Sequence, residues 1–167
     1  ALEGRFEERI SAEIYEQADA QGVPRELAFA TYWTESGGRH NRQQYAWPSG
    51  NPLWTNNTGK GAFQIETKVW SKPGFYHGER FSYSWSENVR VGVAILHDAY
   101  SRAERRFSAG YLYLDPGETR AGVLARSAYA IYNGGPSAWA RPWQRDNDYR
   151  SNDLNFFSNY RAAGGTR

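Results

Sequence analysis

The chain contains no cysteine, which excludes disulfide bonds and thiolate metal sites and leaves the redox compartment open. It also lacks any run near the ~20 apolar residues that a membrane-spanning helix needs. Its mean hydropathy is −0.81. The first ten residues do not follow the charged-then-apolar plan of a signal peptide, so either export does not apply or a leader has been removed. We therefore expect no membrane span in this sequence.

Excess charge of one sign is also missing, because Lys+Arg 20 stand against Asp+Glu 18, a net charge of +2. Nucleic-acid binding requires a strong basic stripe. The cluster of Arg102, Arg105 and Arg106 is interrupted by Glu104, which favours a solvated helix face. We expect no nucleic-acid partner, although the slight positive charge suits a mildly anionic polymer.

Metal-ligand spacing is absent as well. No His-Glu-x-x-His pair occurs, and the histidines are scattered at His40, His77 and His97. Surface or core histidines explain such a pattern better than a metal site does. We therefore expect neither a metal nor a cofactor.

Aromatic residues, in contrast, are abundant at 16%, with Trp 7 and Tyr 12. A core takes about half of them, because Trp and Tyr usually keep a partly exposed edge. The remaining rings can stack on sugars or bases. The length of 167 residues, without an internal repeat or a Pro/Ser-rich linker, indicates one domain over 1–167.

Apolar residues at helical spacing predict a mainly α chain. The expected helices are one that starts near Phe6 and ends near Gly22, and others over 25–36, 66–70, 88–107 and 153–162. Two capping boxes, at 84–87 and 115–118, mark expected helix starts, and the glycines within 133–136 end the helix that follows the second. Turn formers and aromatic rings dominate 39–61, which indicates a long loop or a small β-excursion.

Glu35 is the first candidate for chemistry. It lies eight residues after Leu27, about 80° around an ideal helix, at the margin of the apolar stripe. It also occupies the last helical turn, where the helix dipole disfavours a carboxylate. Both effects favour the protonated form, which general-acid cleavage of an acetal needs. An ordinary surface glutamate near a helix end is the simpler alternative.

Two further segments carry polar groups at informative places. Gly59 and Gly61 permit a close backbone approach, and Gln64 offers a donor and an acceptor to a neutral polar ligand. Tyr132 continues the apolar face of its helix, so we expect a buried ring whose hydroxyl seeks a partner, with Asn133 beside it. Taken separately, a simple turn and a core tyrosine explain these segments better.

Together the segments resemble the three-part signature of soluble lytic transglycosylases. That signature is a Glu-Ser pair, here at 35–36, a Gly-Leu-Met-Gln-like segment, here at 61–65, and an Ala-Tyr-Asn-Ala-Gly-Pro-like segment, here at 130–136. The stretch 85–92 resembles the family's helix with Asn-x-x-x-Gly. The likeness runs over about 23–136. It implies a lysozyme-like, mainly helical domain that cleaves peptidoglycan glycan strands.

The resemblance assigns roles residue by residue. Glu35 matches the catalytic acid/base and Ser36 the residue after it. Gln64 matches the glutamine of the second segment, and Tyr132 the tyrosine near the carboxylate, with Asn133 next to it. Two departures are apparent: Ala62-Phe63 replaces Leu-Met, so that Phe63 reshapes the groove wall, and Ile131 stands where alanine is usual.

Two other functions remain open. Goose-type lysozymes resemble the same framework and carry an acidic residue two places after the glutamine, where Glu66 stands here. An inverting hydrolase needs such a second carboxylate ~6.5–9.5 Å from the acid. The alternative interpretation of Glu66 is a residue that opens the helix over 66–70, where negative charge is favourable. A non-catalytic glycan-binding module would keep the rings but need not keep Glu35, Gln64 and Tyr132 together.

The resemblance implies a bacterial enzyme that acts on peptidoglycan in the periplasm, at the cell wall or in a phage particle. The sequence leaves open whether it belongs to a secretion apparatus, to cell-wall turnover or to a phage. It also leaves open endo or exo cleavage and any requirement for peptide stems.

Overall fold

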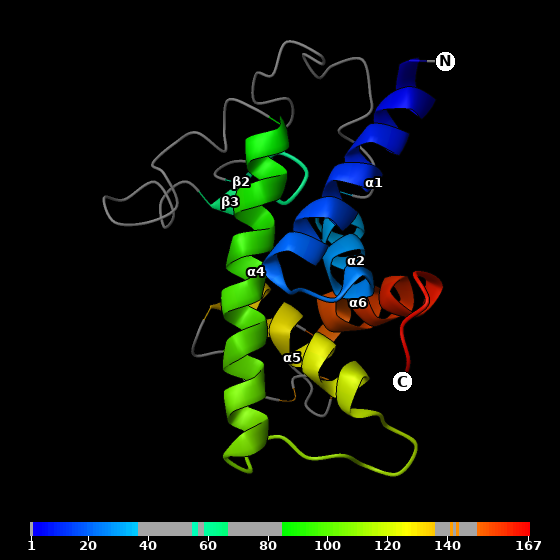
Figure 1. Ribbon diagram of the computed structural model, residues 1–167. Helices are drawn as coiled ribbons and strands as arrows, with labels where there is room; N and C mark the ends of the chain where they lie inside the picture. Colours follow the sequence, from blue (N-terminus) through cyan, green and yellow to red (C-terminus); the bar gives the residue numbers. More distant parts are fainter. Residues whose placement is uncertain are drawn as a thin grey trace, which may run out of the picture.

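The computed structural model describes residues 2–36, 55–56, 59–66, 85–135, 141, 143 and 150–167. These residues are mainly helical (Figure 1). The helices are α1 (Leu2–Gln21), α2 (Arg25–Ser36), α4 (Trp85–Ser108), α5 (Arg120–Gly134) and α6 (Arg150–Ala162). In the described part of the chain, none of the helices is both long and apolar enough to cross a membrane.

The helices pack in two connected groups. α4 lies against α1 and α5, and α2 lies against α1 and α6, while α5 also contacts α6 and α2. Figure 1 shows α4 as the long helix beside α1 and α5. One apolar core runs between these helices and includes Ile14, Leu27, Leu96, Leu124 and Phe156, all without exposed surface. The carboxyl-terminal parts of α2 and α5 therefore lie close together at this core.

The helices that the hydrophobic periodicity predicts are present at 25–36 and near 88–107. α2 covers the predicted residues, and α4 begins at Trp85, inside the capping box at 84–87. The first half of α4 lies in the core, since Val89, Val93 and Leu96 are fully buried. α1 begins before Phe6, and α6 begins before Asp153.

The start of α5 differs from the sequence prediction. Residues 115–118 form a turn in which the Glu118 amide donates to the Asp115 carbonyl at 3.0 Å, and the helix begins only at Arg120. Thr119 caps α5, since its hydroxyl oxygen accepts from the Gly122 amide at 3.0 Å. The Glu118 carboxylate still accepts from the Asp115 amide at 2.7 Å, as in a capping box. These contacts therefore close a turn and do not open a helix.

A small antiparallel sheet precedes α4. Its strands β1 (Thr55–Asn56), β2 (Gly59–Lys60) and β3 (Ile65–Glu66) pair in chain order, with Lys60 opposite Ile65 and Gly59 opposite Glu66. The expectation that Glu66 opens a helix over 66–70 is wrong at Glu66, because its backbone pairs with Gly59. The rest of that range, and most of the expected loop over 39–61, lies outside the described residues.

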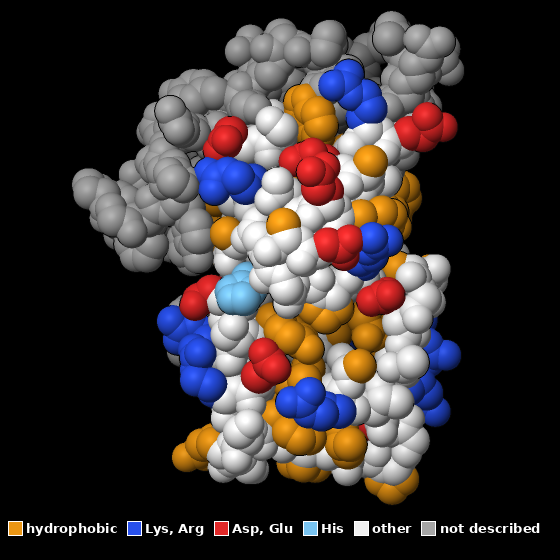
Figure 2. Space-filling model, viewed as in Figure 1, with side chains coloured by type: hydrophobic (Ala, Val, Ile, Leu, Met, Phe, Trp, Pro, Cys, Tyr) orange, Lys and Arg blue, Asp and Glu red, His pale blue; other side chains and the backbone are white. Residues whose placement is uncertain are grey.

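Acidic and basic side chains are interspersed on the face shown in Figure 2. Two of the described ion pairs lie along α4, Arg90 with Glu87 at 2.7 Å and Arg102 with Asp98 at 3.1 Å. A mixed surface of this kind agrees with the small net charge.

Candidate active site

Glu35 lies in the last turn of α2 and is partly exposed. The Tyr129 hydroxyl, on α5, donates a hydrogen bond to Glu35 Oε1 at 3.0 Å. The two residues are 94 positions apart in the chain, so the packing of α2 against α5 creates this contact. The carboxyl group that the sequence singles out is therefore held by a phenol on a neighbouring helix.

The Gly-Ala-Phe-Gln-Ile segment at 61–65 forms a tight turn between β2 and β3. Gly61 has φ 71° and Gln64 has φ 49°, the latter unusual for a residue with a side chain. The Gln64 amide N–H donates to the Gly61 carbonyl at 3.2 Å, and Gln64 Nε2 donates to the same oxygen at 2.7 Å. The Gln64 side chain thus stabilises its own turn, and one of its donors is engaged there.

Side chains of the helices α4 and α5 bind both backbone polar groups of Phe63. Asn88 Oδ1, on α4, accepts from the Phe63 amide at 3.0 Å. The Tyr132 hydroxyl, on α5, donates to the Phe63 carbonyl at 2.5 Å. The sequence predicts a hydrogen-bond partner for the Tyr132 hydroxyl, and that partner is the Phe63 carbonyl in the segment at 61–65. Tyr132 therefore fixes the turn at 61–65 relative to α5, which also carries Tyr129.

Both phenols stay neutral beside Glu35. Burial, the charge of Glu35 and the hydrogen bond to Glu35 raise the pKa of Tyr129 far above its usual range. Burial and the Glu35 charge likewise raise the pKa of Tyr132 well above its ordinary value. Each hydroxyl is accordingly a permanent hydrogen-bond donor, and neither is suited to accept a proton as a base.

A buried ion pair lies behind this site. Arg126 of α5 and Asp153 of α6 meet at 2.7 Å, with 11% and 3% of their side chains exposed. The Arg126 guanidinium also lies 4.2 Å from the Trp143 ring centroid and 4.1 Å from that of Phe157. Burial raises the pKa of Asp153, and the hydrogen bond and charge of Arg126 oppose that effect. The pair joins α5 to α6 one helical turn before Tyr129.

The other predicted site residues differ in how far they are buried. Ser36 is fully buried, and its hydroxyl donates to the Tyr32 carbonyl at 3.2 Å. The expectation that the Phe63 ring lines a groove wall is wrong, because the ring has no exposed surface and packs in the core 6.2 Å from Tyr32. Asn133 is partly exposed in the last turn of α5. The side chain of Glu66 lies outside the description, so its role as a second carboxylate stays a prediction.

Tyr129 is the residue that sequence reasoning missed. It lies three positions before Tyr132 on the same helix, and this spacing brings two side chains close to one another on a helix surface. Two tyrosines so placed were a usable signal. Only the packing of α5 against α2 shows that Tyr129 is the one that reaches Glu35.

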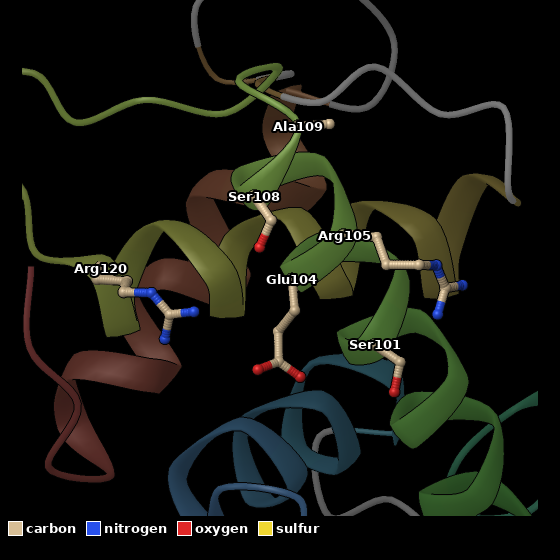
Figure 3. A pocket seen from close by; sticks show the side chains of 6 residues that line it. All are labelled: Ser101, Glu104, Arg105, Ser108, Ala109 and Arg120. Carbon is tan, nitrogen blue, oxygen red and sulfur yellow. The ribbon is translucent and has the colours of Figure 1, made fainter.

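A separate depression of about 610 Å³ lies where the end of α4 meets the start of α5 (Figure 3). Its lining consists of Ser101, Glu104, Arg105, Ser108, Ala109 and Arg120. Figure 3 shows Glu104 and Arg120 extending into the same space from the two helices. The lining carries two arginines against one glutamate, so one positive charge is left over. Across the described residues, no three His, Cys, Asp or Glu side chains lie close enough together to hold a metal ion.

The described residues define a mainly helical protein in which a partly exposed glutamate accepts a hydrogen bond from the buried Tyr129, while the partly buried Tyr132 holds the turn at 61–65. Comparison of the chain with protein-family models, curated proteins and solved structures gives no match.

Proposed function

We propose that the protein is a peptidoglycan lytic transglycosylase with a lysozyme-like fold and with Glu35 as acid and then base. The observation that carries the proposal is the hydrogen bond from Tyr129 to Glu35 beside the turn that Tyr132 and Asn88 hold. It joins the three segments of the family-like signature at one place. A surface glutamate without a role would need no buried phenol on its carboxylate.

In the proposed reaction, protonated Glu35 donates its proton to the glycosidic oxygen between N-acetylmuramic acid and N-acetylglucosamine. The C1–oxygen bond of the muramoyl residue breaks, and the substrate's own acetamido group stabilises the cationic centre. Glu35, now a carboxylate, takes the proton from the muramoyl C6 hydroxyl. The oxygen of that hydroxyl bonds to C1 at the same time. The product ends in a 1,6-anhydro ring, and no water is consumed. One acid/base group is sufficient for both proton transfers.

The surroundings of Glu35 fit this double role. Neutral phenols lie beside the carboxyl group in both of its protonation states, so they add no charge that opposes either proton transfer. Tyr132 attaches the turn at 61–65 to the helix that carries Tyr129, and Gln64 of that turn has donor and acceptor groups of the kind that the hydroxyl and acetamido groups of a neutral sugar bind. Peptidoglycan glycan strands are the proposed partner, in the periplasm, at the cell wall or in a phage particle.

Digestion of purified sacculi tests the proposal. The wild-type protein is expected to release soluble muropeptides, and Glu35→Gln is expected to reduce the rate by at least roughly 10²–10⁴-fold, the usual contribution of general acid–base catalysis. Because the amide oxygen of a glutamine still accepts from Tyr129, the helical circular dichroism and the Tm should stay close to wild type. Activity of Glu35→Gln within about tenfold of wild type, well inside that range, would assign the chemistry to another residue.

A further inference from the structure

Tyr129 is aimed at Glu35 by packing that does not involve the proposed substrate. Its side chain is almost completely buried, and its ring stacks on Phe156 of α6 at 4.5 Å with an interplanar angle of 2°. Phe156 in turn stacks on Tyr160 at 5.9 Å. A ring held between helices in this way has one orientation, so its hydroxyl points at a fixed place. That place is 3.0 Å from Glu35 Oε1.

We propose that Tyr129 is a positioning residue that holds Glu35 Oε1 as a hydrogen-bond acceptor through both proton transfers. This inference rests on the proposed function. In the acid form, Oε1 is the carbonyl oxygen that accepts from the phenol. In the carboxylate form, Oε1 keeps the phenol while Glu35 takes the proton of the C6 hydroxyl. The carboxyl group therefore keeps one orientation in both halves of the reaction.

The phenol performs this task in both halves of the reaction because it does not itself lose a proton. Its burial and the nearby Glu35 charge keep it protonated. A hydrogen bond to an ionised acceptor is stronger than one to a neutral acceptor, so the phenol stabilises the carboxylate more than the acid. Removal of the hydroxyl should therefore raise the pKa of Glu35.

Among the described residues, the polar and charged groups on the helices that pack against α2 keep their partners when this hydroxyl is removed. On α5, the Tyr132 hydroxyl is engaged by the Phe63 carbonyl. On α6, Asp153 is paired with Arg126. On α1, Asp19 is paired with Arg25, which opens α2 at the end opposite Glu35. Within the described part of the chain, the hydrogen bond to Glu35 is therefore the contact that a Tyr129→Phe variant removes.

Carboxyl ¹³C NMR of the glutamates, with the Glu35 signal assigned from Glu35→Gln, measures this pKa without substrate. Tyr129→Phe is expected to raise the pKa of Glu35 by about one unit, the difference between a charged and a neutral hydrogen bond. Tyr160→Phe is the matched control, since it removes the hydroxyl of another buried tyrosine in the same ring stack. It should leave the pKa of Glu35 unchanged. An unchanged or lowered pKa in folded Tyr129→Phe would overturn the inference.

The pH dependence of cleavage gives a second readout that a merely structural role would not move. The protonated acid is the active form of the free enzyme, so kcat/KM falls as the pH rises through the pKa of Glu35. In Tyr129→Phe this fall should move to higher pH by the same amount as the NMR shift, while the plateau at lower pH decreases. A lower plateau with an unmoved pH profile would contradict the positioning role.

A third variant decides the matter if Tyr129→Phe does not fold. Replacement of Tyr129 by 3-fluorotyrosine retains the hydroxyl and makes it a more acidic, stronger donor, so the pKa of Glu35 should decrease. An unchanged or raised pKa would overturn the inference. A failure of the proposed function can be distinguished from a failure of this inference. Wild-type protein that leaves sacculi intact would exclude the transglycosylase activity, whereas the substrate-free titration would still test the hydrogen bond from Tyr129 to Glu35.

Discussion

The Phe63 ring occupies the space where Gly92 would carry a side chain. A Cβ at Gly92 would lie 2.4 Å from Phe63 Cγ, far inside van der Waals contact. Gly92 lies one helical turn after Asn88, which binds the Phe63 amide at 3.0 Å, so the same face of α4 holds the backbone and admits the ring. The Asn-x-x-x-Gly pattern of this helix is therefore a docking surface for the turn at 61–65.

Gly92→Ala should destabilise the protein and lower its activity. Alanine favours a helix over glycine by about 1 kcal/mol, but overpacking of a buried ring costs about 1–3 kcal/mol, and the close approach makes the second effect the larger one. We expect a net loss of about 1–2 kcal/mol in urea unfolding, together with reduced cleavage because the turn moves. His97→Ala, at an exposed position of α4, is the control and should change stability by less than about 0.5 kcal/mol. Wild-type stability of Gly92→Ala would contradict this packing.

Tyr132→Phe should lower turnover more than stability. The variant keeps the ring and removes one hydrogen bond to the Phe63 carbonyl, worth on the order of 1 kcal/mol. The turn that bears Gln64 then loses its attachment to α5, so we expect a large decrease in kcat at a small decrease in Tm. If Tyr132→Phe unfolds readily while its folded fraction turns over normally, the hydroxyl has a structural role only.

Asn88→Ala provides the partner experiment. It leaves the buried Phe63 amide without its acceptor, which costs about 1–3 kcal/mol. Since Asn88 and Tyr132 hold the same peptide segment, their effects should not add. A double-mutant cycle on the free energy of unfolding should give a coupling of about 0.5 kcal/mol or more. Additive effects would show that the two contacts act independently.

Helical periodicity was sufficient to predict the positions of most of the described helices in the sequence. The apolar spacing around Leu27 and along α4 reports which face meets the core, and that signal is local. The start of α5 was mispredicted because 115–118 carry a capping-box pattern that the folded chain uses as a turn. Thr119, the actual cap, is also a favourable cap residue and lies four positions after Asp115, the cap that the box predicts. Glu66 was misplaced for a similar reason, since strand pairing with Gly59 overrides a local helix signal.

The candidate site was predictable in its residues but not in its contacts. The sequence singled out Glu35, Gln64 and Tyr132, yet only the packing of helices distant in sequence assigns Tyr129 to Glu35 and Tyr132 to Phe63. Two tyrosines three residues apart are equivalent as local patterns. Which of them reaches the carboxylate depends on how α5 is rotated against α2, and this is set by core residues along both helices.

Glu118 should make the protein sensitive to acid. Its burial raises its pKa, but hydrogen bonds from Arg141 and the Asp115 amide outweigh burial and hold the pKa below its ordinary value. A carboxyl whose pKa is lower in the folded state contributes stability above its unfolded pKa and loses it as the pH falls through the folded pKa. Wild type should therefore lose stability on acidification below about pH 4.5, the ordinary pKa of the group.

Thermal unfolding of Glu118→Gln at a series of pH values tests this assignment. The variant should melt at a lower temperature than wild type at pH 7, and the difference in Tm should narrow as the pH falls, because glutamine does not titrate. Glu8→Gln, at an exposed position of α1, removes the same charge and should change the Tm little at any pH. A constant difference in Tm between wild type and Glu118→Gln would exclude Glu118 as the titrating group.

The chemistry of the product ends separates the proposed transglycosylase from a hydrolase on the same framework. A muramidase that inverts needs a second carboxylate to activate water, and Glu66 is its candidate, so Glu66→Gln would silence a hydrolase. A transglycosylase should lose much less, because its nucleophile is the C6 hydroxyl of the substrate. Mass spectrometry of digested sacculi should show 1,6-anhydromuramoyl ends, lighter by one water than reducing ends. Predominantly reducing ends, together with an inactive Glu66→Gln variant, would replace the transglycosylase by a lysozyme-type hydrolase. Glu35 would remain the general acid in that case, since both reactions begin with protonation of the glycosidic oxygen.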